Sequence, residues 1–491
     1  MCVAGGTTLM SGDRVRCFAM FVPIAHTFHM ANQPSRPSGY APHYKNLRLR
    51  IVVLLVTLLV SHAIAKDIVL NYPDGTPHFR YQVDARSQKY GSFEEFTPKG
   101  KLKVRGNYSA DKKTAAWIVY GDNGKSQELL TYRNDQLEGP YRFNFPSGLP
   151  QLVTTYHEDD FAGPITVNDE KGHVLRTISY PRRYDAVEQA WDMYYPKTRG
   201  PVKFTDQPKT MAPYESGRIA MEDQQAALKY LMLYRFLSGL PFEKMTIVPT
   251  LIDRAQDGAV LLAKLGTLTQ EPEQPHDMDD AFFKMAYAGC NESNQFKGRQ
   301  NIFDAIDSFM DDSDDANVKD IIHRIGVLNP ALERTGFGCC ADIITQIVAN
   351  GRGPAFTFYA YPGPGYYPRK LLQKDAAWSV HFAGNKVRLA SADALSVHIT
   401  PLDDHFAGSE TVTAEIVGIH DGATTRVIIF RTKLKNLSGA RYYVEISGLR
   451  SPSGATIPFS YLVDLQDMPE MEVKNAATTQ AATTKPVKAG K

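Results

Sequence analysis

Residues 89–124 read KYGSFEEFTPKGKLKVRGNYSADKKTAAWIVYGDNG and span more than one full period of a repeat. Gly100 and Gly124 are 24 residues apart, and this spacing continues on both sides with a single interval of 25. Apolar or aromatic residues lie seven positions before these glycines, and tyrosines lie eight positions after them. The repeated positions are Gly75, Gly100, Gly124, Gly148 and Gly172; Phe93, Trp117, Tyr141 and Ile165; and Tyr108, Tyr132, Tyr156 and Tyr180. A fixed period of this length predicts a repeat array.

Each period predicts a tight turn between two short strands. The glycines follow turn-forming residues such as Asp74 and Asn123, and glycine supplies the positive φ that such turns need. One hairpin cannot bury its own face, so the units are expected to stack into a β-meander. The pattern resembles MORN-variant repeats over about residues 68–183. That resemblance implies an elongated sheet used for contacts, with the aromatic residues as packing; a binding face on the exposed edge is the alternative.

The N-terminal residues read as an export signal. Residues 51–60 are IVVLLVTLLV, with Lys45, Arg48 and Arg50 before them and Ser-His-Ala-Ile-Ala after them. A basic flank, a short apolar core and a small-residue site predict a secretory signal peptide cleaved after Ala65. Met30 is an alternative start, and an uncleaved anchor is the alternative fate. We therefore expect an exported protein, periplasmic or extracellular, with no stable membrane span after cleavage.

Length and charge restrict the class of protein. The 491 residues are enough for two to four domains, and the charged fraction of 22% is ordinary for globular proteins. Lys and Arg number 55 and Asp and Glu 53, so the chain has no overall basic field for nucleic acid. Envelope or extracellular proteins, or a small apolar ligand, are the expected partners.

The middle of the chain changes to helical patterns. Residues 218–238, 248–265 and 301–310 carry apolar residues at helical spacing, and Gly239 with Pro241 ends the first of them. Strand-like apolar runs follow at 343–348 and 355–359. Helices followed by strands predict an α/β sandwich.

Three stretches of this region resemble one family. Residues 234–241 (YRFLSGLP), 323–338 (HRIGVLNPALERTGFG) and 361–368 (YPGPGYYP) are similar to segments of bacterial CAP domains, also called SCP-like. The family name stands for cysteine-rich secretory, antigen 5 and pathogenesis-related proteins. The resemblance covers about residues 215–365, and to 466 with a further β-domain.

The resemblance implies a central cleft with two histidines and two acidic residues, which binds zinc in some members. His323 matches the histidine before arginine, and His276 lies about where the other histidine falls. The family's Gly-Glu-Asn corresponds to Gly289-Cys290-Asn291, so a cysteine replaces the first acid. The second acid has only a positional candidate, Asp312. We therefore predict His276, His323 and Asn291 as cleft residues, with His276 and His323 as zinc ligands and no catalytic residue.

The cysteines leave two roles open. Cys290 could supply a thiolate as a third zinc ligand, or form a disulfide with Cys339 or Cys340 in an oxidising compartment. Neighbours in a strand face opposite ways, so only one of this pair should suit Cys290, and the other would be a buried apolar residue. A strained Cys339–Cys340 bridge is the remaining alternative.

Plainer interpretations stand beside these. His323 and Arg324 could simply hydrogen-bond and hold a strand–helix junction. Asp311, Asp312, Asp314 and Asp315 lack the glycine and terminal Glu of a calcium loop, which favours a solvated turn or a helix start. The sequence shows no phosphate loop, G-x-S-x-G elbow or H-E-x-x-H helix.

Six or seven short alternating strands in residues 366–466 predict an immunoglobulin-like β-sandwich, and residues 467–491 a disordered tail. The expected fold is thus multidomain α+β. Its parts are a leader (1–65), repeats (66–183), a linker (184–214), a CAP-like domain (215–365), the β-sandwich and the tail. We expect a non-enzymatic extracytoplasmic binding protein with a degenerate cleft. The alternatives are a metal-dependent hydrolase acting on peptide or cell-wall material and a structural envelope protein with a vestigial cleft.

Overall fold

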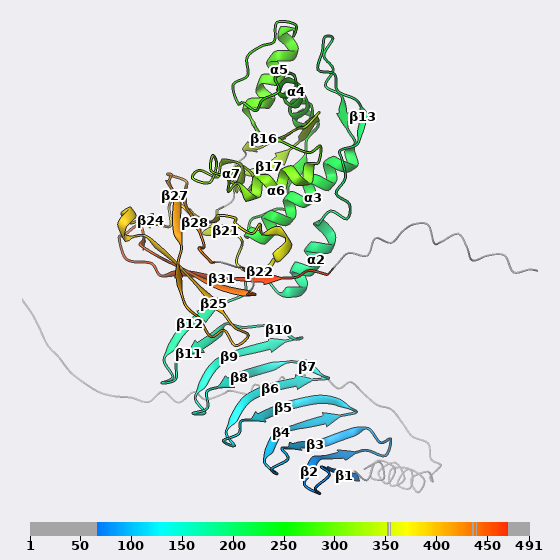
Figure 1. Ribbon diagram of the computed structural model, residues 1–491, viewed down its shortest axis with the longest axis vertical. Coiled ribbons are helices and arrows are strands. Elements are labelled where there is room, and N and C mark those ends of the chain that lie inside the picture. Colours follow the sequence, from blue (N-terminus) through cyan, green and yellow to red (C-terminus); the bar gives the residue numbers. More distant parts are fainter. Residues whose placement is uncertain (1–65, 351–352, 354, 435–436, 438, 470–491) are drawn as a thin grey trace, which may run out of the picture. The chain divides into compact units, whose positions relative to one another are not determined.

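The computed structural model describes residues 66–350, 353, 355–434, 437 and 439–469 (Figure 1). The predicted signal peptide and all but the first three residues of the predicted tail lie outside the described residues. Among the helices within the described ranges, none has both the length and the apolar character needed to cross a bilayer.

Residues 66–178 form one antiparallel sheet of 12 strands (Figure 1). Its path runs in chain order, β1-β2-β3-β4-β5-β6-β8-β9-β11-β12, with β7 paired to β6 and β10 paired to β9. The strands are β1 (Lys66–Asn71), β2 (Pro77–Val83), β3 (Lys89–Phe96), β4 (Leu102–Ser109), β5 (Lys112–Tyr120), β6 (Ser126–Arg133), β7 (Gln136–Leu137), β8 (Gly139–Asn144), β9 (Pro150–His157), β10 (Asp160–Phe161), β11 (Ile165–Asn168) and β12 (Val174–Ile178).

The predicted turns lie at the repeated glycines. All five have φ between 72° and 91°, in the left-handed region. A Cβ added at Gly75, Gly124 or Gly172 would meet nothing within 4 Å, so the backbone angle rather than crowding requires glycine there. The repeated aromatic residues are packing, as predicted: Trp117 is 4% exposed, and its ring lies 5.4 Å from Phe93 and 5.1 Å from Tyr108.

The next part holds most of the helices: α2 (Tyr184–Tyr194), α3 (Met221–Ser238), α4 (Pro249–Leu265), α5 (Asp280–Asn291), α6 (Ile302–Asp311) and α7 (Ile322–Val327). Its strands are β13 (Phe204–Asp206), β14 (Arg218–Ile219), β15 (Thr246–Ile247), β16 (Ser293–Lys297), β17 (Leu332–Thr335), β18 (Phe337–Cys340), β19 (Ile343–Ile347) and β20 (Ala349–Asn350). They form the sheets β13-β14, β15-β17-β20 and β16-β19-β18.

Local signals fix the ends of the predicted helices. Pro249 is the first residue of α4, and Gly239 and Gly266 end α3 and α4 in the left-handed conformation. Asn301 caps α6 by accepting hydrogen bonds from the N–H groups of Phe303 and Asp304. The sequence interpretation did not include α2, α5 or α7, and α2 lies within the predicted linker.

The sheet β16-β19-β18 has helices on both faces. Thr345 donates to the Ala255 carbonyl of α4 at 2.7 Å, while Ile344 shares an apolar cluster with residues of α3 and α6. At the open edge of β18, side-chain amides take the place of a neighbouring strand as hydrogen-bond partners. The Gln224 amide donates to the Phe337 carbonyl and accepts from the Phe337 N–H, and the Gln256 amide does the same for Cys339. The edge therefore leaves no unpaired backbone group at these two residues.

The C-terminal part is built from two facing sheets, β21-β23-β28-β27 and β22-β31-β29-β25-β26, with β24 and β30 as a separate pair. The strands are β21 (Phe358–Tyr361), β22 (Gly365–Pro368), β23 (Trp378–Ala383), β24 (Arg388–Leu389), β25 (Ser396–Leu402), β26 (Val412–Thr413), β27 (Glu415–Asp421), β28 (Thr425–Arg431), β29 (Arg441–Ser447), β30 (Leu449–Arg450) and β31 (Phe459–Gln466). We call this part the β-sandwich. It begins earlier than residue 366, because β21 pairs with β23.

The last repeat strands pack against the β-sandwich. One cluster joins Tyr141, Leu152, Ile165, Val167 and Ile178 of the repeats to Leu402, Phe406, Tyr443 and Leu462. A polar contact accompanies it, since the Tyr180 hydroxyl donates to Asp464 at 2.5 Å and Arg441 donates to the same carboxylate at 3.0 Å.

Candidate functional site

The segment between α6 and α7 places a carboxylate next to the family-matched histidine. Asp312 follows α6 directly with φ 43°, in the left-handed region, and Ile321 precedes α7 with the same φ of 43°. His323 is the second residue of α7. Its carbonyl accepts from the Asn294 amide of β16 at 3.0 Å, so α7 is tied to the edge of the sheet.

Asp312 holds His323 at two points. Its Oδ1 lies 2.8 Å from His323 Nδ1, and its Oδ2 accepts from the backbone N–H of His323 at 3.0 Å and of Arg324 at 3.3 Å. The Asp312 side chain is 1% exposed and that of His323 20%. The His323 ring also stacks on Phe309, with ring centres 5.6 Å apart.

The carboxylate decides which nitrogen of the ring is available. An ionised carboxylate only accepts hydrogen bonds, so Nδ1 must carry the proton that points to Asp312. In the neutral ring, Nε2 is then an unprotonated acceptor. The described residues offer Nε2 no hydrogen-bond partner of its own. We call these two residues the Asp312–His323 pair.

The pair lines a cleft of about 450 Å³. Its apolar walls are the Phe296 and Phe309 rings with Leu268 and Ile322, and its polar lining is Thr269, Gln270, Gln295, Lys297, Ser308, Asp314 and Asn317. The backbone of β16 forms one side, and the Gln295 amide donates to the Thr269 carbonyl at 2.8 Å. The site therefore combines aromatic surface with hydrogen-bonding groups and a fixed imidazole.

Of the three residues predicted for the cleft, only His323 lines it. His276 is exposed in the loop between α4 and α5 and is absent from the cleft lining. Asn291, the last residue of α5, is also exposed, and its amide donates to the Gln270 carbonyl at 3.5 Å. It therefore lies behind the loop that forms the wall of the cleft.

The zinc prediction finds no assembled ligand set. A protein zinc site needs three or four donors around one point. Over the described ranges, no group of three or more His, Cys, Asp or Glu side chains could hold a metal ion. His323 is already paired to Asp312, and the other residues that line the cleft offer one further carboxylate, Asp314, together with Lys297, amides, hydroxyls and apolar side chains. The residues present do not fit a zinc site of the predicted kind.

The disulfide alternative is not formed in this structure, where the three cysteines among the described residues, Cys290, Cys339 and Cys340, are free and buried. Cys339 and Cys340 face opposite sides of β18, as the strand alternation predicts. Cys339 enters the cluster that holds α3 and α6, whereas Cys340 joins Cys290 in the cluster beneath α4 and α5. The Cys290 thiol donates to the Gly258 carbonyl at 3.6 Å. Cys290 thus belongs to the packing of α4 and α5 and not to the cleft.

Thiol counting tests this arrangement. Burial raises the pKa of Cys290 and Cys339 from 9.0 to about 12 and that of Cys340 to about 11. Thiolates are the reactive form, so the native protein should react very slowly with a thiol reagent at pH 8. After unfolding in guanidinium, three thiols per chain from residue 66 on should react. A count of one thiol would mean that two cysteines are bridged.

Sequence reasoning undervalued Asp312. We interpreted the acidic run 311–315 as a solvated turn, but Asp312 is buried and burial also raises the pKa of Asp311. The walls of the cleft were missed as well, because they come from the loop after α4, from β16 and from α6. The available signal was that Asp312, eleven residues before His323, is a positional candidate for the second acid of the family resemblance.

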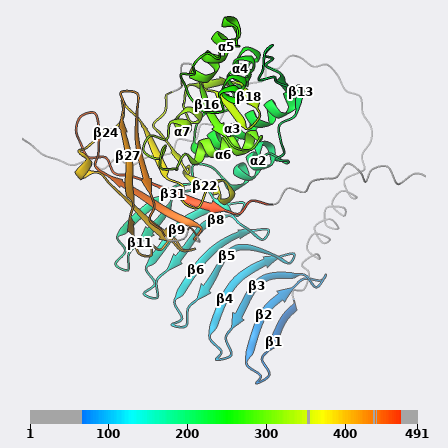
Figure 2. The ribbon, with the colours of Figure 1, turned by 45° about the horizontal axis from the view of Figure 1, so that its top comes forward.

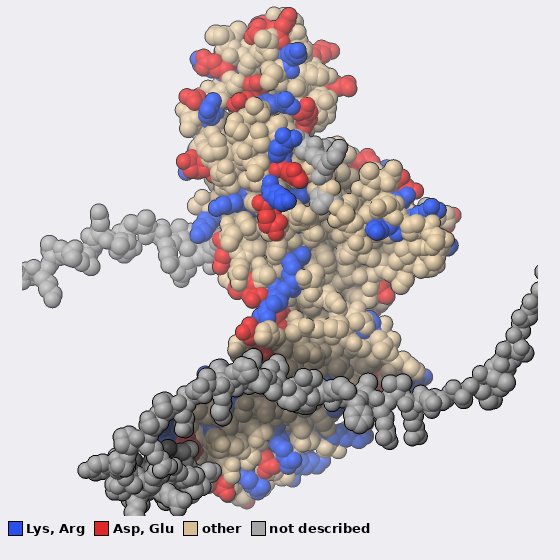
Figure 3. All heavy atoms as spheres, turned by 180° about the vertical axis from the view of Figure 1, so that it is seen from behind, with Lys and Arg blue, Asp and Glu red and all other residues tan. Residues whose placement is uncertain are grey.

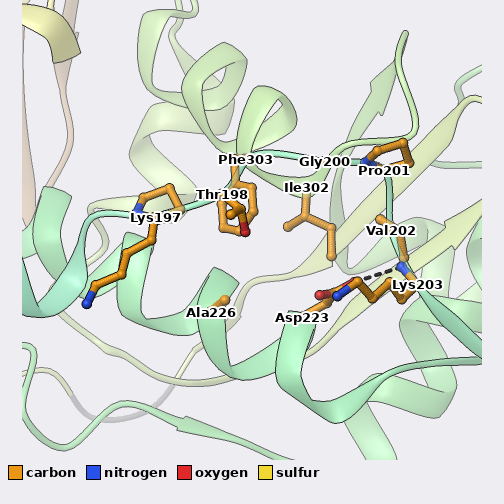
Figure 4. Close-up of a pocket in the computed structure, with 11 residues that line it drawn as sticks. Lys197, Thr198, Gly200, Pro201, Val202, Lys203, Asp223, Ala226, Ile302 and Phe303 are labelled. Carbon is orange, nitrogen blue, oxygen red and sulfur yellow. Dashed lines mark hydrogen bonds between the residues drawn. The ribbon is translucent and has the colours of Figure 1, made fainter. Parts of the chain in front are cut away.

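A second cavity, of about 520 Å³, lies beside the starts of α3 and α6 (Figure 4). Figure 4 shows Ile302 and Phe303 on one side and Ala226 on the other, with Lys203 next to Asp223. The Asp223 carboxylate accepts from the Lys203 backbone N–H at 2.7 Å. This cavity has volume but no acid–base pair, so the cleft at His323 is the stronger candidate site.

No family model and no curated protein matches the chain. One similar solved structure is an extracellular protein containing an SCP domain from Bacillus anthracis, 12% identical over 58% of this chain and 85% of that chain, with a TM-score of 0.21. Another is a cysteine-rich secretory protein from Staphylococcus aureus, 12% identical over 60% of this chain and 89% of that chain, with a TM-score of 0.18. TM-scores this low carry no argument about fold or function, so membership of the CAP family stays a prediction.

Proposed function

We propose that this chain is an exported, non-enzymatic binding protein whose cleft holds a small hydrogen-bonding ligand against His323. The observation that carries the proposal is the Asp312–His323 pair: one ring nitrogen is fixed by a buried carboxylate, and the other is left free in the wall of a cleft. Orienting the imidazole in this way requires a buried carboxylate, and burying a carboxylate costs free energy. A histidine with a merely structural role does not require one.

The lining favours an amide-bearing ligand with an apolar group. The free Nε2 accepts one N–H or O–H. The Gln295 amide gives both its N–H groups to the Thr269 and Cys290 carbonyls, so its oxygen can only accept. Gln270 and Asn317 each use one amide N–H, on the Ser293 carbonyl and on Asp314, and keep the other for a ligand. The Phe296 and Phe309 rings offer surface to an apolar part of the ligand. A purely apolar ligand, as predicted from the sequence, would leave the His323 Nε2 in the cleft without a hydrogen-bond partner.

The proposal is tested with N-acetylated amino-acid amides as probes, by saturation-transfer NMR on the purified protein. His323→Phe is the matched variant, because phenylalanine keeps a ring against Phe309 but has no nitrogen. We expect at least one probe to bind the wild-type protein and to lose about tenfold or more in affinity with His323→Phe. Equal binding to both forms would contradict the proposal, and no binding to either would favour the vestigial cleft.

Asp312→Asn should weaken both the site and the fold. The substitution replaces a charged acceptor of three donors, two of them backbone N–H groups, by a neutral amide. We expect the free energy of unfolding to fall by about 2 kcal/mol and probe affinity to fall with it. Urea denaturation measures the first effect and the NMR titration the second. Asp315→Asn, in the same acidic run but exposed, should change neither.

The metal-dependent hydrolase has less support. It needs an assembled metal site, which the described residues do not provide, and a reacting group beside the base. The face in Figure 3 also gives little to a polyanion, because basic and acidic side chains are interspersed over the part of it that is not drawn in grey. Binding of a neutral ligand fits the site better than metal-dependent hydrolysis or binding of a polyanion.

A further inference from the structure

The residue after Asp312 is held by the β-sandwich. Ser313 Oγ accepts from the backbone N–H of Ala377, just before β23, at 2.8 Å. The Ser313 carbonyl accepts from the guanidinium of Arg431, the last residue of β28, at 2.9 Å. Ser313 Oγ also donates to the Asp311 carbonyl at 2.5 Å. Ser313 is therefore hydrogen-bonded to the β-sandwich through both its hydroxyl oxygen and its carbonyl oxygen.

The residues before Asp312 are held to the same strands through Arg324. Its guanidinium donates to the Met310 carbonyl at 2.6 Å and also to the Asp311 carbonyl. The same group donates to the Ala377 carbonyl at 2.9 Å and to Ser379 Oγ at 3.1 Å. Arg324 has no exposed surface. It thus ties the end of α6 to β23 from inside the molecule.

The loop between Asp312 and His323 also lies on the β-sandwich. Figures 1 and 2 both show α7, at the end of this loop, beside β27. An apolar cluster joins Val318 and Ile321 of the loop to residues of the β-sandwich, namely Ala377, Val427 and Ile429. Gly418 of β27 lets the loop approach, because a Cβ there would lie 2.1 Å from the Lys319 carbonyl oxygen.

The conformation of this loop needs external support. Asp312 and Ile321, at its two ends, both have φ 43°. This backbone region is unfavourable for a residue with a β-carbon, and a β-branched residue such as isoleucine is a clear outlier there. Such residues persist where the surrounding contacts fix them. The contacts that do so here come largely from β23, β27 and β28.

We propose that the β-sandwich is the positioning part of the cleft: Ser313 and Arg431 act through Asp312 to fix the tautomer and the direction of His323. The β-sandwich is then a structural requirement for the site and not only a separate contact module. For what the cleft binds, this inference rests on the proposed function. For the geometry of the Asp312–His323 pair, it rests only on the contacts above.

Two variants test it, Ser313→Ala and Arg431→Met, with Ser313→Thr and Arg431→Lys as conservative rescues. The control is Thr400→Ala, which removes a buried hydroxyl of the β-sandwich that bonds Thr411 and not the loop. The first readout is the tautomer of the His323 ring, from long-range ¹H–¹⁵N NMR of the full protein at neutral pH. The second is affinity for an N-acetylated amino-acid amide.

In the wild type we expect His323 with the proton on Nδ1. In Ser313→Ala and Arg431→Met we expect a mixture of tautomers and an affinity lower by about tenfold, both restored by the conservative rescues. Thr400→Ala should leave both readouts unchanged, even where it lowers stability. If Arg431→Met does not fold, Ser313→Ala, which removes a single oxygen atom, decides the test.

Wild-type ring signals and wild-type affinity in Ser313→Ala would overturn the inference and leave the β-sandwich a merely structural neighbour. The two proposals fail separately. If no form of the protein binds a probe while the ring signals change in the variants, the proposed function fails and the positioning role stands. If probes bind and the ring signals stay constant across the variants, the positioning role fails alone.

Discussion

Replacing Arg324 by Met should lower the free energy of unfolding by about 3–5 kcal/mol. Methionine fills a similar volume but donates no hydrogen bond. Four acceptors would each lose one donor, and the buried Met310 and Ala377 carbonyls would lose the only side chain described as bonding them, at about 1–3 kcal/mol for each unsatisfied group. The Asp311 carbonyl keeps the Ser313 hydroxyl, and Ser379 Oγ keeps its contact with His381. Arg324 also lies over the Tyr361 ring, with its guanidinium carbon 4.3 Å from the ring centre.

A competing effect works in the opposite direction. Burial lowers the pKa of Arg324, and the nearby Asp311 and Asp312 carboxylates offset this only in part, so its charge is itself costly. The loss of four hydrogen bonds outweighs the stability gained by removing a buried charge, because the acceptors stay buried. Urea denaturation compares this variant with Arg105→Met, whose side chain is 55% exposed and should change stability by no more than about 0.5 kcal/mol. An Arg324→Met protein as stable as wild type would show that the acceptors find other donors.

Gly289→Ala should destabilise the protein by about 2–3 kcal/mol. Glycine to alanine inside a helix normally adds stability, by up to about 1 kcal/mol. Here an added Cβ would lie 2.0 Å from the Arg254 carbonyl oxygen and 3.0 Å from the Gly258 nitrogen. Both atoms are backbone atoms of α4, so the helices α4 and α5 would have to move apart.

Gly200→Ala is the matched control, because a Cβ there meets nothing within 4 Å and the residue has no positive φ. Chemical denaturation should show a loss for Gly289→Ala and little change for Gly200→Ala. Equal stability of the two variants would mean that α4 and α5 are less closely packed than described.

The parts that could be predicted from sequence are those fixed by local signals. The repeat glycines mark turns, because each turn needs the same backbone angle and the period reproduces it. Helices α3, α4 and α6 have apolar faces together with clear end signals, such as Pro249, Gly266 and Asn301. Helix α7 has only six residues, which is too short for a periodic pattern.

The site could be predicted only in part, because its geometry depends on distant contacts. Asp312 lies in an acidic run whose local pattern indicates solvent. Its burial is set by His323 and by the strands near Ala377 and Arg431, which no local pattern connects to it. Cys290 fits a disulfide with Cys339 or Cys340 by composition and compartment. The two faces of β18 separate Cys339 from the cluster of Cys290, and Cys340 shares that cluster but is a free thiol there. His276 entered the prediction by a loose alignment in a loop.

The central claim is that His323 presents a free Nε2, set by Asp312, to a ligand in the cleft. The most direct measurement follows the His323 ring nitrogens by long-range ¹H–¹⁵N NMR during a titration with an N-acetylated amino-acid amide. We predict the Nδ1–H tautomer throughout and a saturable shift of the Nε2 signal as the probe binds. An Nε2–H tautomer in the free protein, or ring signals that stay fixed while the probe saturates, would contradict the account.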